Sequence, residues 1–84
     1  MTNINNNMSP GEVLREVPGL TRDKLNYWVL KRYIDVVVDQ RGNRNYNFFR
    51  QKDLLIIKKA YDYIIIKKMK DSEAFRKIYE ELNK

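Results

Sequence analysis

Two stretches of the chain decide its fold, LNYWVLKRYI at residues 25–34 and YNFFRQKDL at residues 46–54. In the first stretch apolar residues recur at intervals of three and four, which is the period of an amphipathic helix. The β-branched residues at 34–39 and the aromatic residues at 46–49 favour a pleated surface. Between them lies a polar, turn-forming segment that contains Gly42. We therefore expect a helix, a two-stranded hairpin and a further helix, in that order.

Another helix is expected ahead of this region, because Ser9, Pro10 and Glu12 form a helix start. Ser9 can cap the helix, Pro10 suits its first position, and Glu12 can reach back to complete a capping box. Gly19 then allows a tight turn, and Thr21 can cap the next helix. Two short helices joined by a few residues that include glycine are typical of a helix-turn-helix.

The second half of the chain predicts two longer helices, at 51–69 and 72–82. Neither glycine nor proline occurs after Gly42, which suits long helices. The helix at 51–69 is apolar on two sides, and we expect it to be sandwiched within the fold. Its core stripe is expected to consist of Leu54, Ile57, Tyr61, Ile64 and Ile65. Its second apolar side is expected to consist of Leu55, Ile56, Tyr63 and Ile66.

The expected architecture is one small domain at 9–84, mostly α-helical with a two-stranded β-hairpin. A chain of 84 residues suits a single core. Residues 1–8 include four asparagines and no charge, so we expect a disordered tail there. The predicted helices lie at 10–16, 22–31, 51–69 and 72–82, and the predicted hairpin lies at 34–49.

Composition narrows the possible functions. Lysine and arginine total 17 against 11 acidic residues, a net charge of +6, which indicates a basic face for nucleic acid. The chain has no cysteine and no histidine, so it lacks thiolate ligands and the usual general base. We expect neither an enzyme nor a bound cofactor or metal. The longest apolar runs are far shorter than the roughly 20 residues that span a bilayer, and no signal peptide precedes them. The expected location is the cytoplasm, with the nucleoid.

The helix at 22–31 divides into two sides. At 100° per residue, Lys24, Tyr27 and Lys31 fall roughly opposite the apolar side, where a basic and aromatic row could meet phosphates and base edges. Two further cations, Arg41 and Arg44, lie at the expected hairpin tip. The core side of this helix is expected to consist of Leu25, Trp28 and Val29.

Several short motifs occur in a characteristic order. They are Gly11-Glu12-Val13, Gly19-Leu20-Thr21, Leu25-Asn26-Tyr27-Trp28, Arg32-Tyr33-Ile34 and the segment 44–54. Together they resemble the DNA-binding domain of the mercury-resistance regulator (MerR) family of winged helix-turn-helix proteins. The resemblance covers residues 8–83, nearly the whole chain.

The resemblance implies sequence-specific binding of double-stranded DNA and regulation of transcription. The helix at 22–31 would enter the major groove, and the hairpin would act as a basic wing on the DNA backbone. Asn26 is the best candidate for direct readout, because an amide can pair bidentately with adenine. The residues expected to contact DNA are Arg22, Lys24, Asn26, Tyr27, Lys31, Arg32, Arg41, Asn43, Arg44, Asn45, Tyr46 and Asn47.

The chain also departs from the family pattern. Asn26 and Asn47 stand where family members usually have arginine. Arg32 stands where they have glycine, which adopts backbone conformations that arginine rarely adopts, so the conformation at residue 32 is open at this point. Family members usually dimerise through a long helix that follows this domain and sense ligands there or beyond, and these 84 residues include no such segment. The cations expected to compensate are Arg22, Lys24, Arg44 or Arg50.

Two alternatives stay open at this point. The small excisionases of phages and integrative elements resemble the same winged fold without an effector domain, and they bend DNA to assist a recombinase. A protein-interaction adaptor without DNA binding is the other alternative, in which an aliphatic face docks a partner. The same face could support a weak homodimer or a DNA-dependent oligomer. Its residues are Leu55, Ile56, Tyr63 and Ile66.

Overall fold

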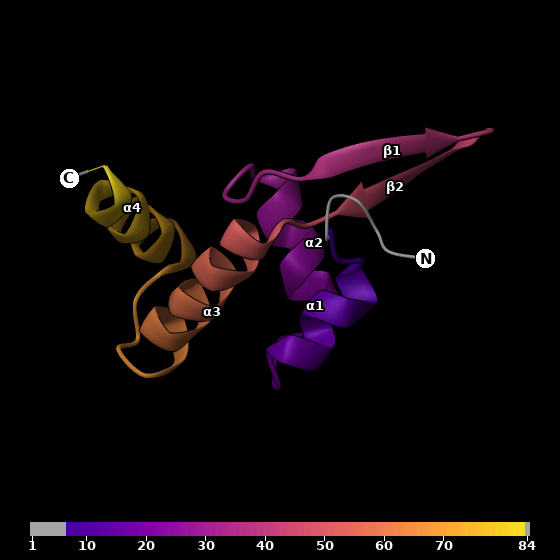
Figure 1. The fold of residues 1–84 in the computed structure, drawn as a ribbon. Helices are drawn as coiled ribbons and strands as arrows, with labels where there is room; N and C mark the ends of the chain where they lie inside the picture. Colours follow the sequence, from indigo (N-terminus) through magenta and orange to yellow (C-terminus); the bar gives the residue numbers. More distant parts are fainter. Residues whose placement is uncertain (1–6, 84) are drawn as a thin grey trace.

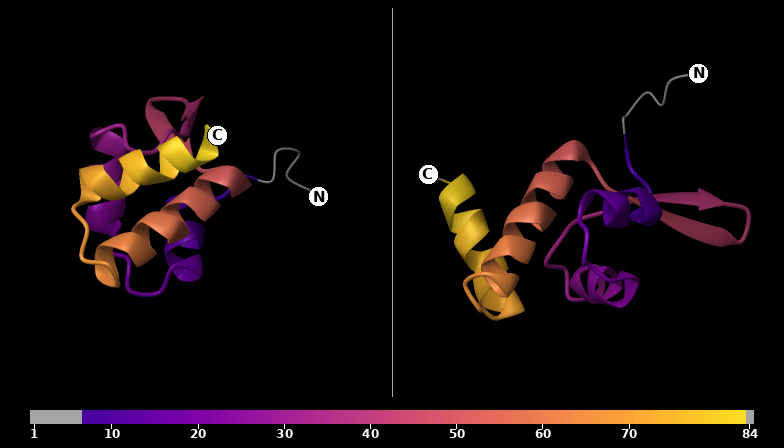
Figure 2. Two further views of the ribbon diagram at one scale, coloured as in Figure 1. Left: turned by 90° about the vertical axis from the view of Figure 1, so that its left-hand side faces the viewer. Right: turned by 90° about the horizontal axis from the view of Figure 1, so that it is seen from below.

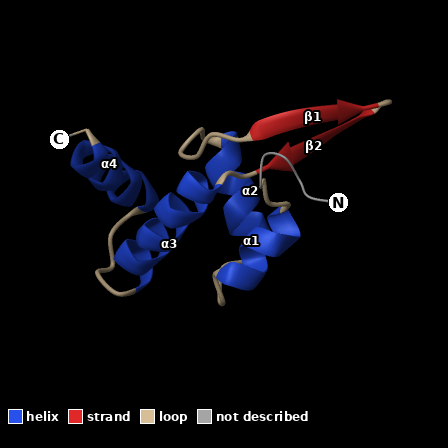
Figure 3. Ribbon diagram, viewed as in Figure 1, coloured by secondary structure: helices blue, strands red, loops and turns tan. Residues whose placement is uncertain are grey.

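The computed structural model describes residues 7–83 of the chain. It is mostly helical with one antiparallel hairpin, which confirms the predicted class (Figures 1 and 3). The elements in chain order are α1 (Pro10–Glu16), α2 (Arg22–Leu30), β1 (Val37–Arg41), β2 (Arg44–Phe48), α3 (Gln51–Ile65) and α4 (Asp71–Leu82).

Helices α1 and α2 begin where their capping residues stand. The Ser9 hydroxyl accepts a hydrogen bond from the Glu12 amide at 3.3 Å, and the Glu12 carboxylate accepts one from the Ser9 amide at 2.8 Å. This reciprocal pair is a capping box, and it holds the pKa of Glu12 below its ordinary value. The Thr21 hydroxyl caps α2 by accepting from the amide of Lys24 at 3.1 Å. Between the two helices the chain turns at Gly19, whose φ is +95°.

The hairpin projects beyond the helices, as Figure 1 and the right-hand view of Figure 2 show. Its register pairs Val37 with Phe48 at the base and Arg41 with Arg44 at the tip. At the base, Met8 exchanges two backbone hydrogen bonds of 2.7 Å with Phe49. Met8 was expected in a disordered tail, and the structure corrects that boundary because the bridge ties Met8 to the fold. The remainder of that expected tail, apart from Asn7, lies outside the described residues.

The core lies where α2, α3 and α4 meet. Trp28 from α2 is fully buried, and its ring meets that of Phe75 from α4 edge to face with centroids 5.0 Å apart. Helix α3 lies between α4 and the pair α1–α2, the arrangement expected from its two apolar sides (Figures 1 and 2). Other fully buried residues of the core are Val13, Leu25, Ile34, Phe49, Ile57 and Ile78.

One residue of α3 lies on a different side from the expected one, and another bears out the expected sandwich. Ile56, on the second apolar side, is only 8% exposed and lines the hollow between α3 and α4, as expected for a helix that α4 covers on that side. Ile65 was placed in the core stripe, but it is 48% exposed. It follows Ile64 by 100° around the helix axis, which turns it out of the buried stripe. Leu55 and Ile66 are exposed and Tyr63 is half-buried, so the docking face of the adaptor alternative is interrupted at Ile56.

Two of the predicted helices, 22–31 and 51–69, end earlier in the structure, each shortly before a residue with positive φ. Helix α2 was expected to reach Lys31 but ends at Leu30, because Arg32 adopts a left-handed conformation with φ +62°. The Tyr33 amide then donates to the Trp28 carbonyl and the Arg32 amide to the Val29 carbonyl, which is a Schellman motif. Helix α3 was expected to reach 69 but ends at Ile65, shortly before Lys68 at φ +59°.

No helix within residues 7–83 combines the length and the apolar composition that crossing a membrane requires.

Candidate nucleic-acid interface

The outward face of α2 carries residues that can read a ligand. Asn26, Tyr27 and Leu30 all point away from the core side of the helix, and Tyr27 and Leu30 are 44% and 79% exposed. Leu30 follows Asn26 by four residues and Tyr27 by three, so the three side chains are neighbours on one helix face. Asp23 precedes Asn26 by three residues and Tyr27 by four, and it is exposed on the same face. The face therefore offers an amide, a phenol, an aliphatic group and one carboxylate.

The ring of Tyr27 lies near two other side chains, those of Tyr33 and Lys31. Its centroid lies 6.3 Å from that of Tyr33, with the ring planes at 75° to each other. The Nζ atom of Lys31 lies 6.0 Å from the Tyr27 centroid, at the outer limit of a cation–π contact. Two of the predicted site residues, Tyr27 and Lys31, are thus brought together.

Lys24 occupies a different position from the expected one. Its Nζ atom lies 3.2 Å from Oδ2 of Asp71, the first residue of α4. Lys24 precedes Trp28 by one helical turn, and the indole Nε1 of Trp28 donates to the same Asp71 oxygen at 2.7 Å. The expectation that Lys24, Tyr27 and Lys31 form one outward row is therefore wrong for Lys24, whose charge faces α4.

Helix α4 holds the end of α2 in place. The Phe75 ring stacks on Tyr33 with centroids 5.3 Å apart, in addition to its contact with Trp28. The Tyr79 hydroxyl donates to the Tyr33 carbonyl at 2.7 Å. Burial is the main cause that raises the pKa of Tyr79 above its ordinary value. These contacts fix the chain where it leaves α2, and so they fix the angle between α2 and the hairpin.

The predicted hairpin residues divide between two faces. Asn45 pairs with Gln40 and Asn47 with Val38, so these four residues share one face of the hairpin. Arg44 and Tyr46 alternate with them and occupy the opposite face. Arg44, Asn45 and Tyr46 are exposed, Asn43 is exposed in the turn, and Asn47 is half-buried. The backbone of Arg41 ends β1, and its side chain lies outside the described part of the structure.

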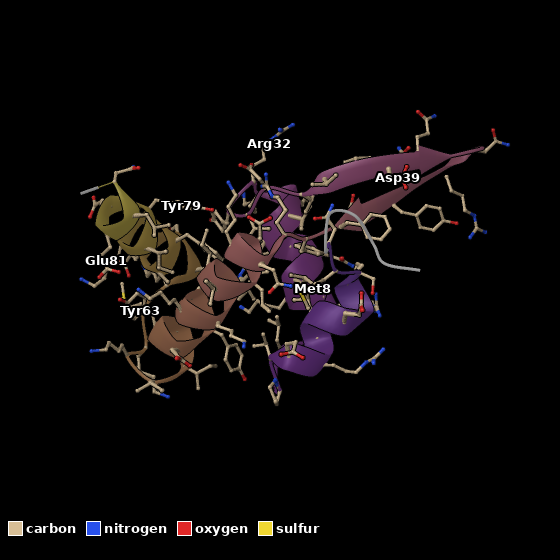
Figure 4. All side chains as sticks on the ribbon, in the orientation of Figure 1. Met8, Arg32, Asp39, Tyr63, Tyr79 and Glu81 are labelled. Carbon is tan, nitrogen blue, oxygen red and sulfur yellow. The ribbon has the colours of Figure 1, made fainter. Side chains whose placement is uncertain are left out.

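A hollow of about 410 Å³ joins the end of α2 to the root of the hairpin. Leu30 and Arg32 line it from the α2 side, and Val38 and Asn47 line it from the hairpin. Figure 4 shows Arg32 above this junction, pointing away from the helices. The exposed face of α2 and the amide face of the hairpin meet at this hollow, which the exposed Asp35 also lines, and we call the two faces together the α2–hairpin surface. Arg22, exposed at the first position of α2, lies at its other end.

Arg50, a cation expected to compensate for the missing arginines, is engaged inside the fold. Its Nε donates to Oδ2 of Asp53 at 2.8 Å, and its amide donates to the same oxygen at 3.0 Å. The hydrogen bond to Asp53 is the main cause that raises the pKa of Arg50. Asp53 is the buried member of the pair, and both residues stabilise the start of α3.

A second hollow, of about 550 Å³, lies between α3 and α4. Leu55 and Leu82 are its exposed apolar walls, and Ile56 and Ile78 lie buried at its base. Lys52 belongs to its rim. Of the four residues in the adaptor alternative, Leu55 and Ile56 line this hollow, and Tyr63 and Ile66 do not.

Two residues of the α2–hairpin surface were missed from the sequence, Leu30 and Asp23. Their spacing of three and four residues from Asn26 and Tyr27 is the signal that finds them. Leu30 was passed over because apolar residues of a helix are ordinarily assigned to the core.

Comparison with protein-family models, with curated protein sequences and with solved structures found no match to this chain. The resemblance to the MerR family thus rests on the motifs in the sequence.

Proposed function

We propose that this protein binds double-stranded DNA with a winged helix-turn-helix of the MerR type and regulates transcription. In this proposal α1 and α2 form the helix-turn-helix, α2 is the recognition helix, and the hairpin is the wing. The observation that carries the proposal is the α2–hairpin surface. It joins an exposed polar and aromatic helix face to a projecting hairpin in a chain of net charge +6.

The shape of this surface suits duplex DNA. The major groove is about 12 Å wide and admits one α-helix, and the proposed recognition helix presents its face without another element covering it. Arg22, Lys31 and Arg32 lie on α2 or directly after it, where they can reach the phosphates on either side of the groove. Such contacts supply affinity and orientation, while side chains on the groove face supply specificity.

The hairpin would contact the backbone beside the helix. Arg44 at its tip is exposed, and Asn43 and Asn45 offer amides for phosphate oxygens. Because the hairpin projects beyond the helices, it can follow the duplex past the segment read by α2 (Figure 3). The backbone bridge between Met8 and Phe49 restricts movement of the hairpin at its base.

Selection of bound fragments from genomic DNA tests the proposal. The purified chain is incubated with fragments at about 100 mM salt, and the retained DNA is sequenced. We expect enrichment of a short motif that is lost in a variant with Arg22→Ala and Lys31→Ala. The matched control carries Lys67→Ala and Lys77→Ala, two exposed cations that lie just after α3 and on α4. No enrichment by the unaltered chain would contradict the proposal.

The arrangement of the enriched DNA motif distinguishes a transcription regulator from the excisionase-like alternative. An inverted repeat indicates a symmetric pair of chains, as for a dimeric regulator. Tandem direct repeats bound cooperatively would instead favour the excisionase-like alternative, in which several copies bend the duplex.

A further inference from the structure

Leu30 is the most exposed large apolar side chain among residues 7–83, at 79%. It lies in the last turn of α2, where Leu25 and Trp28 are fully buried and Val29 is half-buried. Covering a leucine side chain with an apolar group of a ligand is favourable, so Leu30 can contribute to binding on this face.

The neighbours of Leu30 define what it could contact. Asn26 precedes it by one helical turn and Tyr27 by three residues, both exposed. Across the hollow stands Val38 of β1, 56% exposed. A duplex seated on the α2–hairpin surface would cover this apolar pair together with the Asn26 amide.

Only one apolar group projects into the major groove of DNA, the C5 methyl of thymine. An asparagine amide beside it pairs with N6 and N7 of adenine. Asn26 and Leu30 are four residues apart, about 6 Å along the helix, which is comparable with one to two base-pair steps of about 3.4 Å. The two side chains can therefore contact neighbouring base pairs.

We infer that α2 reads an A·T step, with Asn26 pairing an adenine and Leu30 contacting the methyl group of an adjacent thymine. This inference rests on the proposed function and names the class of DNA site that it recognises. Leu30 is then a specificity-determining residue. Asp23 lies on the same face, and its negative charge would disfavour the close approach of a phosphate.

Three synthetic duplexes of 24 base pairs test it, with alternating A·T, alternating A·U and alternating G·C sequence. Replacing thymine by uracil removes only the methyl group. Binding is measured by fluorescence anisotropy in one low-salt buffer. We expect the unaltered chain to bind the A·T duplex about four-fold more tightly than the A·U duplex, the worth of one buried methyl group. We expect it to bind the A·T duplex at least about ten-fold more tightly than the G·C duplex.

Two variants separate the two contacts. Leu30→Ala should bind the A·T and A·U duplexes equally while still preferring both over G·C. Asn26→Ala should lose most of the preference over G·C and keep the four-fold effect of the methyl group. Leu55→Ala, which truncates an exposed leucine on α3, is the matched control and should behave as the unaltered chain. Circular dichroism of each variant checks that the fold is retained.

Equal binding of all three duplexes with a strong dependence on salt would overturn the inference and leave DNA binding intact. A methyl effect that persists in Leu30→Ala would likewise overturn the role of Leu30. Absence of binding to any duplex would overturn both the inference and the proposed function.

Discussion

The indole Nε1 of Trp28 donates a 2.7 Å hydrogen bond to Oδ2 of Asp71, a residue 43 positions later in the chain. Trp28 is fully buried, and a buried indole N–H requires an acceptor. The same carboxylate oxygen lies 3.2 Å from the Lys24 Nζ atom. One residue at the start of α4 thus sets the rotation of α2 about its axis, and with it the direction in which the proposed recognition face points.

Replacing Asp71 tests this relationship. Asp71→Ala leaves the Trp28 N–H without its acceptor, and we expect the free energy of unfolding to fall by about 1–3 kcal/mol. Asp71→Asn keeps an acceptor oxygen and should cost less. Urea denaturation followed by tryptophan fluorescence measures both. Glu80→Ala removes an exposed carboxylate from the same helix and should change the free energy of unfolding by less than about 0.5 kcal/mol. Equal losses in Asp71→Ala and Glu80→Ala would contradict the role given to Asp71.

Arg32 has a backbone conformation that favours glycine, and so does Lys68. Arg32→Gly and Lys68→Gly should each raise the free energy of unfolding by about 0.5–1 kcal/mol, because a left-handed conformation strains an L side chain. Only Arg32 belongs to the α2–hairpin surface, so only Arg32→Gly should weaken binding to DNA. Thermal unfolding measures the stability of each variant, and anisotropy titrations measure its affinity for DNA. The same loss of affinity in both variants would show that Arg32 makes no specific contact.

Asp23 is a negative charge on the face proposed to enter the groove. Asp23→Asn should raise affinity for duplex DNA about five-fold at low salt, the effect of removing a repulsion of about 1 kcal/mol. The gain should shrink as salt screens the charge. Asp62→Asn, an exposed position on α3, serves as the control and should change affinity little. A loss of affinity in Asp23→Asn would mean that the carboxylate accepts a hydrogen bond from DNA, for instance from cytosine N4.

Tyr79 makes stability depend on alkaline pH. Its folded pKa lies above the ordinary value of 10.0, so the protonated phenol stabilises the fold fully below that pH and the contribution is lost as pH rises through the folded pKa. At about pH 8 the free energy of unfolding of the unaltered chain should exceed that of Tyr79→Phe by about 1 kcal/mol, the contribution of the hydrogen bond to Tyr33. The difference should shrink above pH 10. Urea titrations at pH 8 and above pH 10 measure it, and a difference independent of pH would contradict the link between ionisation of Tyr79 and stability.

Elements specified by local signals could be predicted from the sequence. Ser9 and Thr21 cap their helices in the structure as their residue types and spacing predict, since a cap involves atoms three residues apart. The hairpin follows from β-branched and aromatic residues on either side of the turn at Gly42, whose φ is +60°.

Features set by distant residues could not be predicted in this way. Lys24 turns towards Asp71, 47 residues away, and the helical pattern of α2 contains no sign of that partner. Met8 belongs to the fold because its backbone pairs with Phe49, 41 residues later in the chain. The early end of α2 at Leu30 was missed since Arg32 gives no glycine signal for a left-handed residue.

The dependence of affinity on salt tests DNA binding through the α2–hairpin surface most directly. The dissociation constant for one duplex is measured by anisotropy between about 50 and 300 mM salt. If about five phosphates are neutralised, the logarithm of affinity should fall with the logarithm of salt concentration with a slope of roughly −4 to −5. Removing Arg22 and Lys31 together should reduce the magnitude of that slope by about two. A slope near zero, or one unchanged in that variant, would contradict the proposed mode of binding.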